Sequence, residues 1–187
     1  MGSNLLIEKP LSHSIEKVND FFQICKKNNL IVLLGYNLRF LPSLNVFKQL
    51  IDDKSIGNIL SIRCEVGQFL PDWRPNKDYT KSVSAQKKLG GGVLLELSHE
   101  IDYIRWIFGE VNWVSSYIGK HSQLKIDVED NALILCGLKQ SNEKPLTASI
   151  NIDFFRQDIT RKCTAIGDKG SLIWNGILGK VVKFDIN

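Results

Sequence analysis

The second half of the chain consists of short apolar runs separated by turns. Six strand-like runs occur at residues 111–119, 132–138, 147–154, 162–167, 171–174 and 180–186. The connections between them are rich in glycine, asparagine, aspartate and lysine, and GDKG at residues 167–170 is the clearest turn. Runs joined by such turns usually pair as antiparallel hairpins. We therefore expect a mostly antiparallel sheet from this half of the chain.

The first 36 residues predict a strand, a helix and a second strand. LLIEKP at 5–10 is a short apolar run that ends in a proline, and IVLLGY at 31–36 is a continuous apolar run typical of a strand buried on both faces. Between them, apolar residues at three- and four-residue spacing predict a helix that begins at Ser14. The two strands should be parallel. This βαβ unit cannot cover its own sheet, so we expect it to be the end of a larger Rossmann-like α/β domain.

The residues between these two parts predict a helix and a further strand. The helix runs from Pro42 to near Gly57, and ILSIRCEVGQF at 59–69 alternates as a strand does. The side of this strand that includes Leu60 is apolar at every step, so we expect that side to be buried. Helices packed on an antiparallel sheet define the α+β class. We therefore predict a Rossmann remnant over residues 1–38 and an α+β substrate and oligomerisation domain over residues 39–187.

Composition excludes several classes of protein. The basic residues are scattered and the net charge is only +4, which argues against a nucleic-acid partner. No apolar run reaches the roughly 18 residues that a membrane span needs. The four cysteines, Cys25, Cys64, Cys136 and Cys163, lie far apart in the chain and form no C-x-x-C motif. We expect reduced, buried thiols in a cytoplasmic protein, and no metal site.

The segment GGGVLLELSHEIDYIRWIFG, residues 90–109, combines glycines, apolar residues and charges. A single helix from Val93 would place one apolar face toward the core, made of Val93, Leu94, Leu97, Ile101, Ile104 and Phe108. The opposite face would carry His99, Tyr103 and Trp106, with Glu96 at its border. The pattern fits an amphipathic helix with a wet second face, but clustered exposed apolar groups usually mark a contact. The glycines could also border a phosphate, although G-x-G-x-x-G spacing is absent.

Four stretches together resemble the Gfo/Idh/MocA family (glucose–fructose oxidoreductase and inositol dehydrogenase). They are IEKPLS at 7–12, GYNLRF at 35–40, DWRP at 72–75 and the glycine segment at 90–109, in the family's order. The resemblance implies an NAD(P)-dependent dehydrogenase that transfers hydride between NAD or NADP and a hydroxyl-bearing carbon of a sugar or cyclitol. It also implies homodimers or homotetramers formed through the sheet, and a cis Lys9–Pro10 bond.

The resemblance places Lys9 and His99 beside the nicotinamide, where a base must take the hydroxyl proton as hydride leaves. A histidine can titrate near neutrality without help. Glu96 is a third catalytic candidate, but it precedes His99 by three residues, whereas the family often has an aspartate four residues before. Glu100 and Asp102 are expected to pair or orient rather than catalyse. The cofactor contacts implied by the resemblance are Glu8, Lys9, Pro10, Arg39, Trp73 and Arg74.

Two further interpretations stay open. Arg39 and Arg74 are equally compatible with ion pairs or surface positions. The chain also lacks the G-x-G-x-x-G turn and the residue about 20 positions later that reads the ribose. By the resemblance, it begins late in the Rossmann domain and ends before the last sheet strands, so we expect it to bind NAD(P) poorly and to be inactive by itself. The alternative function is a non-catalytic module that assembles through its β-sheet, or a degenerate dehydrogenase.

Overall fold

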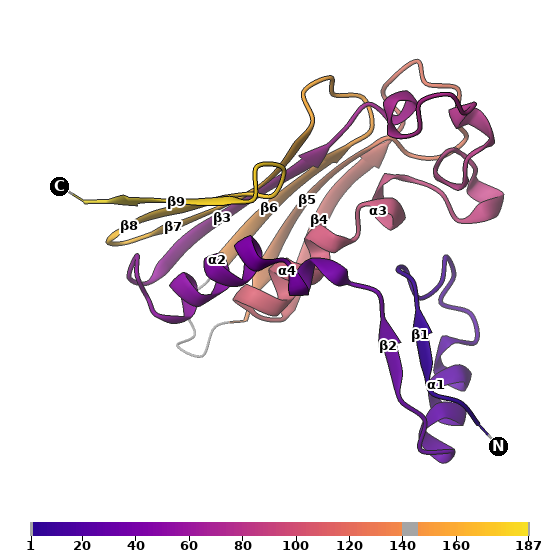
Figure 1. Ribbon diagram of the computed structural model, residues 1–187, viewed down its shortest axis with the longest axis horizontal. Helices are drawn as coiled ribbons and strands as arrows, with labels where there is room; N and C mark the ends of the chain where they lie inside the picture. The colour runs from indigo at the N-terminus through magenta and orange to yellow at the C-terminus, as the bar shows by residue number, and fades with distance from the viewer. Residues whose placement is uncertain (1, 140–145, 187) are drawn as a thin grey trace.

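The computed structural model describes residues 2–139 and 146–186 of the chain. A small βαβ unit at the N-terminus projects from a larger part in which helices pack on a seven-stranded sheet (Figure 1). This arrangement confirms the predicted α+β class. Within the described residues, no helix is long and apolar enough to cross a membrane.

The N-terminal unit contains the predicted parallel strands. β1 (Leu5–Ile7) pairs with β2 (Val32–Leu34), and α1 (Val18–Lys27) connects them. The helix begins at Val18 rather than at Ser14. The Ser14 N–H donates to the Ser12 hydroxyl and the Glu16 N–H donates to the Ser14 hydroxyl, both at 3.1 Å. Such local hydrogen bonds compete with helix formation.

The prediction that the second strand is buried on both faces was wrong. Leu33 of β2 is 60% exposed, and its register partner on β1, Leu6, is 79% exposed. Side chains that point to the same face of a two-stranded ribbon are adjacent, so these leucines form one uncovered apolar face.

The large sheet has the strand order β4-β5-β6-β3-β7-β8-β9. Its strands are β3 (Ile59–Gly67), β4 (Val111–Gly119), β5 (Asn131–Leu138), β6 (Leu146–Asp153), β7 (Thr160–Gly167), β8 (Gly170–Asn175) and β9 (Lys180–Asp185). Four predicted hairpins are present as antiparallel pairs, namely β4–β5, β5–β6, β7–β8 and β8–β9. The runs at β6 and β7 do not pair, because β3 lies between them, parallel to β6 and antiparallel to β7.

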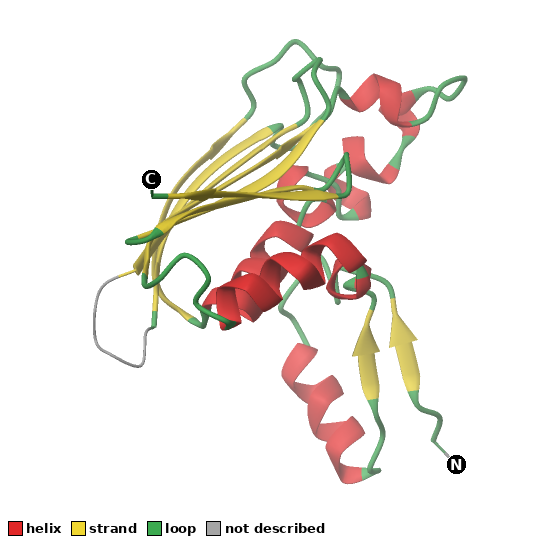
Figure 2. Ribbon diagram, turned by 60° about the vertical axis from the view of Figure 1, so that its left-hand side comes forward, coloured by secondary structure: helices red, strands yellow, loops and turns green. Residues whose placement is uncertain are grey.

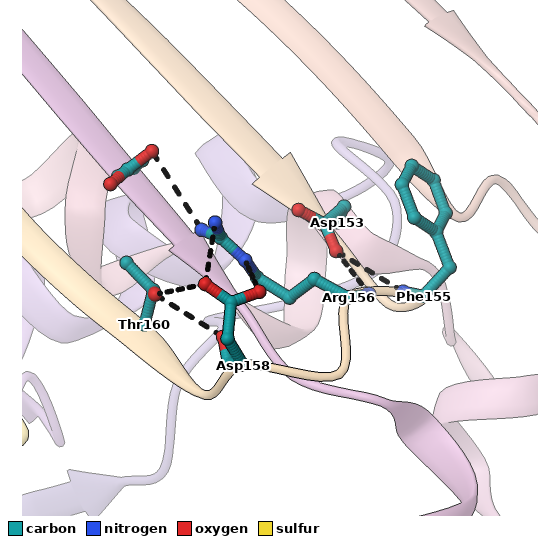
Figure 3. A network of polar contacts seen from close by, with 6 residues as sticks. Asp153, Phe155, Arg156, Asp158 and Thr160 are labelled. Carbon is teal, nitrogen blue, oxygen red and sulfur yellow. Dashed lines mark hydrogen bonds and ion pairs between the residues drawn. The ribbon is translucent and has the colours of Figure 1, made fainter.

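The connection from β6 to β7 therefore crosses the end of β3 (Figure 3). Asp153 accepts two backbone N–H groups of this turn at 2.9 and 3.2 Å, and the Arg156 guanidinium contacts Asp158 at 3.2 Å and Glu65 of β3 at 3.7 Å. A Cβ at Gly67 would lie 2.6 Å from both Arg156 Cδ and Asp153 Oδ2. Glycine at the end of β3 thus permits the close crossing.

Three α-helices lie on one face of the sheet (Figure 2). They are α2 (Pro42–Asp52), α3 (Val93–Glu96) and α4 (His99–Phe108). Short 3₁₀ turns complete the helical part: η1 (Asn37–Phe40), η2 (Leu70–Trp73), η3 (Tyr79–Lys81), η4 (Val83–Ala85) and η5 (Lys87–Leu89). The largest fully buried side chains, which form the core between the two layers, include Phe47, Tyr103, Phe154 and Trp174. The four cysteines are free and buried, as predicted.

The alternation in β3 was predicted correctly except at its start. Ile62, Cys64 and Val66 are buried on the helix-covered face, whereas Leu60 is 58% exposed. The pairing of β3 with β7 shifts register between Ile59 and Ser61. A bulge of this kind leaves one residue out of the regular pairing, which accounts for the exposure of Leu60.

Candidate active site

The glycine segment folds into two helices rather than one. α3 ends at Glu96, and α4 begins at His99 after a break at Leu97, whose φ of −106° and ψ of 32° depart from helical values. Val93, Leu97 and Phe108 are buried, as the single-helix pattern predicted. Tyr103 was expected on the second face but is fully buried, because it packs against the sheet: its hydroxyl lies 2.9 Å from Cys64 Sγ and its ring 5.4 Å from that of Trp174.

The turn before α3 is occupied by a carboxylate of this chain. Gly92 has a φ of 113°, and a Cβ there would lie 2.3 Å from Glu129 Oε1. Glu129 accepts the Leu94 N–H through this oxygen at 3.2 Å and the Val93 N–H through its backbone carbonyl at 3.1 Å. The first free N–H groups of the helix are therefore satisfied within the chain. Because Gly92 has no side chain, the Glu129 carboxylate can approach the backbone this closely.

The end of β1 meets the break between α3 and α4. The Lys9–Pro10 peptide bond is cis, as the resemblance implied. The Lys9 ammonium donates to the backbone carbonyl of Glu96 at 2.5 Å, and its charge acts on the His99 imidazole. Residues from the E-K-P motif and from the glycine segment thus lie together. Glu96 takes part through its main chain, and within residues 2–139 and 146–186 its carboxylate makes no hydrogen bond or ion pair.

His99 is half-buried at the start of α4. Its ring packs edge-on against Tyr36, with 5.6 Å between the centroids, and its Nδ1 atom is buried without a hydrogen-bond partner in the described part of the chain. Burial lowers the pKa of His99 to about 4, helped by the charges of Lys9 and Arg161 and opposed by Asp102. The ring is therefore neutral at pH 7, because burial and both cations disfavour the imidazolium.

Asp102 on α4 forms a two-point ion pair with Arg39 of η1. The distances are 2.8 Å from Arg39 Nε to Oδ2 and 2.6 Å from Nη2 to Oδ1, and the Asp102 side chain is 9% exposed. This hydrogen-bonded pair raises the pKa of Arg39. The guanidinium also lies over the Trp106 ring, 5.6 Å from its centroid. The ion pair that the sequence left open for Arg39 is thus present, and it fixes η1 to α4.

Glu100, the next residue after His99, is fully buried. Its Oε1 atom accepts from Arg161 Nε of β7 at 2.8 Å. Burial raises the pKa of Glu100, and Arg161 opposes this rise. The expected pairing roles of Glu100 and Asp102 are thus observed. Two residues near the site were not predicted: Arg161 is one basic residue near the start of a strand, and Tyr36 is one member of the GYNLRF stretch.

The remaining candidates lie elsewhere. Trp73 in η2 donates its indole N–H to the Gln68 carbonyl at 3.2 Å, and its ring contacts Phe154 edge-on at 5.2 Å. With the exposed Arg74, it lines a pocket of about 310 Å³ formed within residues 70–84. Glu8 lies over the end of β2, where a Cβ at Gly35 would be 2.9 Å from its carboxylate. In the described ranges, no group of His, Cys, Asp and Glu side chains could hold a metal ion.

Residues 45–173 match the family described as GFO/IDH/MocA C-terminal domain. This match covers more than half of the chain. The chain therefore belongs to the Gfo/Idh/MocA family of oxidoreductases.

Individual relatives agree with this assignment. Levoglucosan dehydrogenase from Pseudarthrobacter phenanthrenivorans is 30% identical over 119 residues, which are 63% of this chain and 30% of that protein. An uncharacterized oxidoreductase of Synechocystis, sll0816, is 26% identical over 185 residues, 92% of this chain and 48% of that protein. The WlbA dehydrogenase from Bordetella pertussis, solved with NADH and UDP-GlcNAcA, has the same fold, with a TM-score of 0.80 at 20% identity over 98% of this chain and 52% of that one. The chain thus spans about half the length of these proteins or less.

Proposed function

We propose that this chain is the substrate-side part of an NAD(P)-dependent dehydrogenase that transfers hydride between the nicotinamide and a hydroxyl-bearing carbon of a sugar or cyclitol. The observation that carries the proposal is the meeting of Lys9 and His99, from distant parts of the sequence, at the break between α3 and α4. Membership of the oxidoreductase family supports it. So do a relative named for levoglucosan and a structural relative solved with NADH and a UDP-sugar.

Removal of the hydroxyl proton requires a proton acceptor and a group that stabilises the negative charge on the oxygen, and His99 and Lys9 suit these two roles. His99 is neutral at pH 7, so its ring can accept the proton of the substrate hydroxyl. Lys9 has three N–H donors, of which one is used by the Glu96 carbonyl. The others can donate to the substrate oxygen and stabilise the negative charge that develops on it. The nicotinamide supplies the acceptor for the hydride.

For the cofactor we propose NAD or NADP, held in part by residues around the end of β1. The Lys9 charge acts on His99, whose buried Nδ1 atom has no partner among the described residues, and the cis Pro10 follows Lys9 directly. Such an orphaned polar atom fits a position next to a bound polar group. Glu8 and the Trp73–Arg74 pair are further proposed contacts. Arg39 would act indirectly, since Asp102 already holds it.

We further propose that these 187 residues alone bind NAD(P) weakly or not at all. The sequence contains no G-x-G-x-x-G turn, on which pyrophosphate binding in Rossmann domains depends. Calorimetric titration of the chain with NAD⁺ and NADP⁺ tests this, and a dissociation constant in the low micromolar range would contradict it.

Turnover of the complete protein with NAD(P) and a panel of sugars tests the catalytic assignment. Lys9→Ala and His99→Ala should each lower kcat/KM by about 10²- to 10⁴-fold, the usual contribution of a positioned acid or base. Arg105→Ala provides a control, because it removes an exposed cation from α4. Full turnover in both site variants would overturn the proposal.

Glu96→Gln separates two roles of that residue. It preserves the backbone carbonyl that binds Lys9 but removes the carboxylate charge. A loss as large as that of His99→Ala would make the carboxylate catalytic, whereas unchanged turnover would limit Glu96 to holding Lys9.

A second proposed function is assembly into a homodimer or homotetramer through the open sheet face. Apolar side chains cluster on that face over β4 and β5, where Trp113, Tyr117, Leu133 and Leu135 are 43 to 60% exposed. Cross-strand pairing places Tyr117 directly opposite Leu133. A contiguous apolar surface of this kind usually marks a contact with another chain.

A further inference from the structure

Two contacts join the start of η1 to the first turn of α4. The rings of Tyr36 and His99 meet edge to face, with 5.6 Å between their centroids and 82° between their planes. Three residues further along each element, Arg39 and Asp102 form the ion pair at 2.6 and 2.8 Å. Residues three apart lie on the same side of a 3₁₀ turn and of an α-helix. The two elements therefore face each other through one aromatic and one ionic contact.

The backbone of Tyr36 is held in one conformation. Its φ of −75° and ψ of 68° are those of the central residue of an inverse γ-turn, across which the Asn37 N–H donates to the Gly35 carbonyl at 2.8 Å. The Gly35 N–H in turn donates to the Ile7 carbonyl of β1 at 2.7 Å. Tyr36 is thus fixed between the β1–β2 strand pair on one side and the ion pair of η1 with α4 on the other.

No hydrogen bond of the described residues orients the His99 imidazole. A histidine that moves a proton usually has its second nitrogen fixed by a carboxylate or a carbonyl, which sets the orientation of the ring. Here the buried Nδ1 atom has no such partner in the described part of the chain. The nearby carboxylate of Asp102 is instead bound at two points by Arg39. The contact that remains is with Tyr36, and an edge-to-face contact favours one relative orientation of two rings.

We propose that Tyr36 is a positioning residue whose ring sets the orientation of the His99 imidazole before the substrate binds, and that the Arg39–Asp102 ion pair keeps Tyr36 in place. This inference rests on the proposed role of His99 as the base. Within the described ranges the Tyr36 hydroxyl has no hydrogen-bond partner, so the ring is the part of this side chain that acts. The GYNLRF stretch thus takes part in the reaction through His99.

NMR of this chain tests the contact itself. The chain has three histidines and four tyrosines, and the variants His99→Gln and Tyr36→Phe identify the two rings. We expect nuclear Overhauser effects between the ring protons of His99 and Tyr36 in the wild type. Their absence would overturn the proposal.

The role of the ion pair is tested by the same signals. Arg39→Gln with Asp102→Asn removes the pair without leaving a charge unpaired, and it should weaken the effects between the two rings. The matched control is Arg105→Gln with Glu110→Gln, which removes an exposed ion pair of 2.6 Å at the other end of α4 and should leave them unchanged. Rings that stay in contact without the Arg39–Asp102 pair, or an equal loss in the control, would overturn the part assigned to that pair.

Turnover of the complete protein tests the consequence for the reaction. Tyr36→Leu removes the ring and should lower kcat by about 10- to 100-fold with little change in KM, because a misplaced base slows the chemical step without weakening binding. Tyr36→Phe keeps the ring and should have a kcat close to that of the wild type. An unchanged kcat in Tyr36→Leu, or a Tyr36→Phe variant as slow as Tyr36→Leu, would overturn the proposal.

Combined substitutions distinguish an effect through His99 from a general loss of structure. A residue that acts through another has little further effect once the other is removed. Tyr36→Leu should therefore change turnover little in a His99→Ala background. The same fold-loss in both backgrounds would overturn the positioning role and leave His99 as the base. Failure of the proposed function is seen instead as full turnover of His99→Ala by itself, and the positioning role then fails with it.

Discussion

His99 lies half-buried near two cations, Lys9 and Arg161, and its imidazole therefore resists protonation. The pKa is about 4 in the folded chain, against about 6.5 for an unperturbed histidine. Between these values the unfolded chain binds a proton that the folded chain does not. The free energy of unfolding must therefore fall as the pH falls from about 6.5 to about 4. The contribution of His99 is fully present above this window.

Urea unfolding at pH 7.5 and pH 5 measures this linkage. We expect the wild-type chain to lose more stability between the two pH values than His99→Gln, which has no imidazole to protonate at this position. His121→Gln is the matched control, since His121 is exposed. Equal losses in the wild type and in His99→Gln would contradict the assigned environment.

The candidate site was only partly predictable at this scale. Lys9 and His99 were found from the E-K-P motif and the glycine segment, because both are local patterns. Arg161 was missed because its contact with Glu100 joins residues 61 positions apart, which no local pattern records. The lowered pKa of His99 comes first from burial, which depends on the packing of the whole site, so it too required the structure.

At the scale of the elements, the glycine segment shows which buried residues a helical repeat predicts and which it does not. A 3.6-residue repeat predicted the burial of Val93, Leu97 and Phe108 correctly. It failed for Tyr103, which packs against Cys64 and Trp174 of the sheet, and it did not predict the break at Leu97. The break has a use, since it exposes the Glu96 carbonyl that Lys9 binds.

The turn that starts this segment gives a prediction about stability. Gly92→Ala should lower the free energy of unfolding by about 1–3 kcal/mol, because its φ of 113° disfavours a side chain and the new Cβ would meet the Glu129 carboxylate. Gly179→Ala is the control, with a φ of 63° and no atom within 4 Å of the new Cβ. It should cost about 1 kcal/mol.

Urea denaturation compares the two variants. A further Glu129→Ala substitution should recover part of the loss in Gly92→Ala, since it removes the contact but not the backbone strain. If Gly92→Ala were no less stable than Gly179→Ala, the close approach of Glu129 would be contradicted.

For the whole molecule, local turns predicted the hairpins, but the position of β3 could not be predicted from them. The alternation of β3 fits any place in a sheet with one covered face. Its insertion between β6 and β7 pairs it with residues about 80 to 110 positions later, which no local pattern records. The same sheet leaves its other face open, and the apolar patch over β4 and β5 predicts self-association.

Sedimentation velocity of the chain tests this association. We expect the wild type to form dimers or larger assemblies at high micromolar concentration. Leu133→Lys with Leu135→Lys should yield monomers, because both side chains are exposed on the open face. Val46→Lys, on exposed α2 surface, should leave the assembly unchanged. A monomeric wild-type chain would contradict the assembly proposal.

The central place of β3 also affects the order in which the protein can fold. Ile62 pairs with Ala148 and Cys64 with Cys163, so the middle strand must wait for partners made roughly a hundred residues later. During synthesis, both hydrogen-bonding edges of β3 stay unpaired until β6 and β7 emerge. Ribosome-bound chains that end before β6 should therefore be cut by protease within β3, and longer ones that include β7 should be protected there.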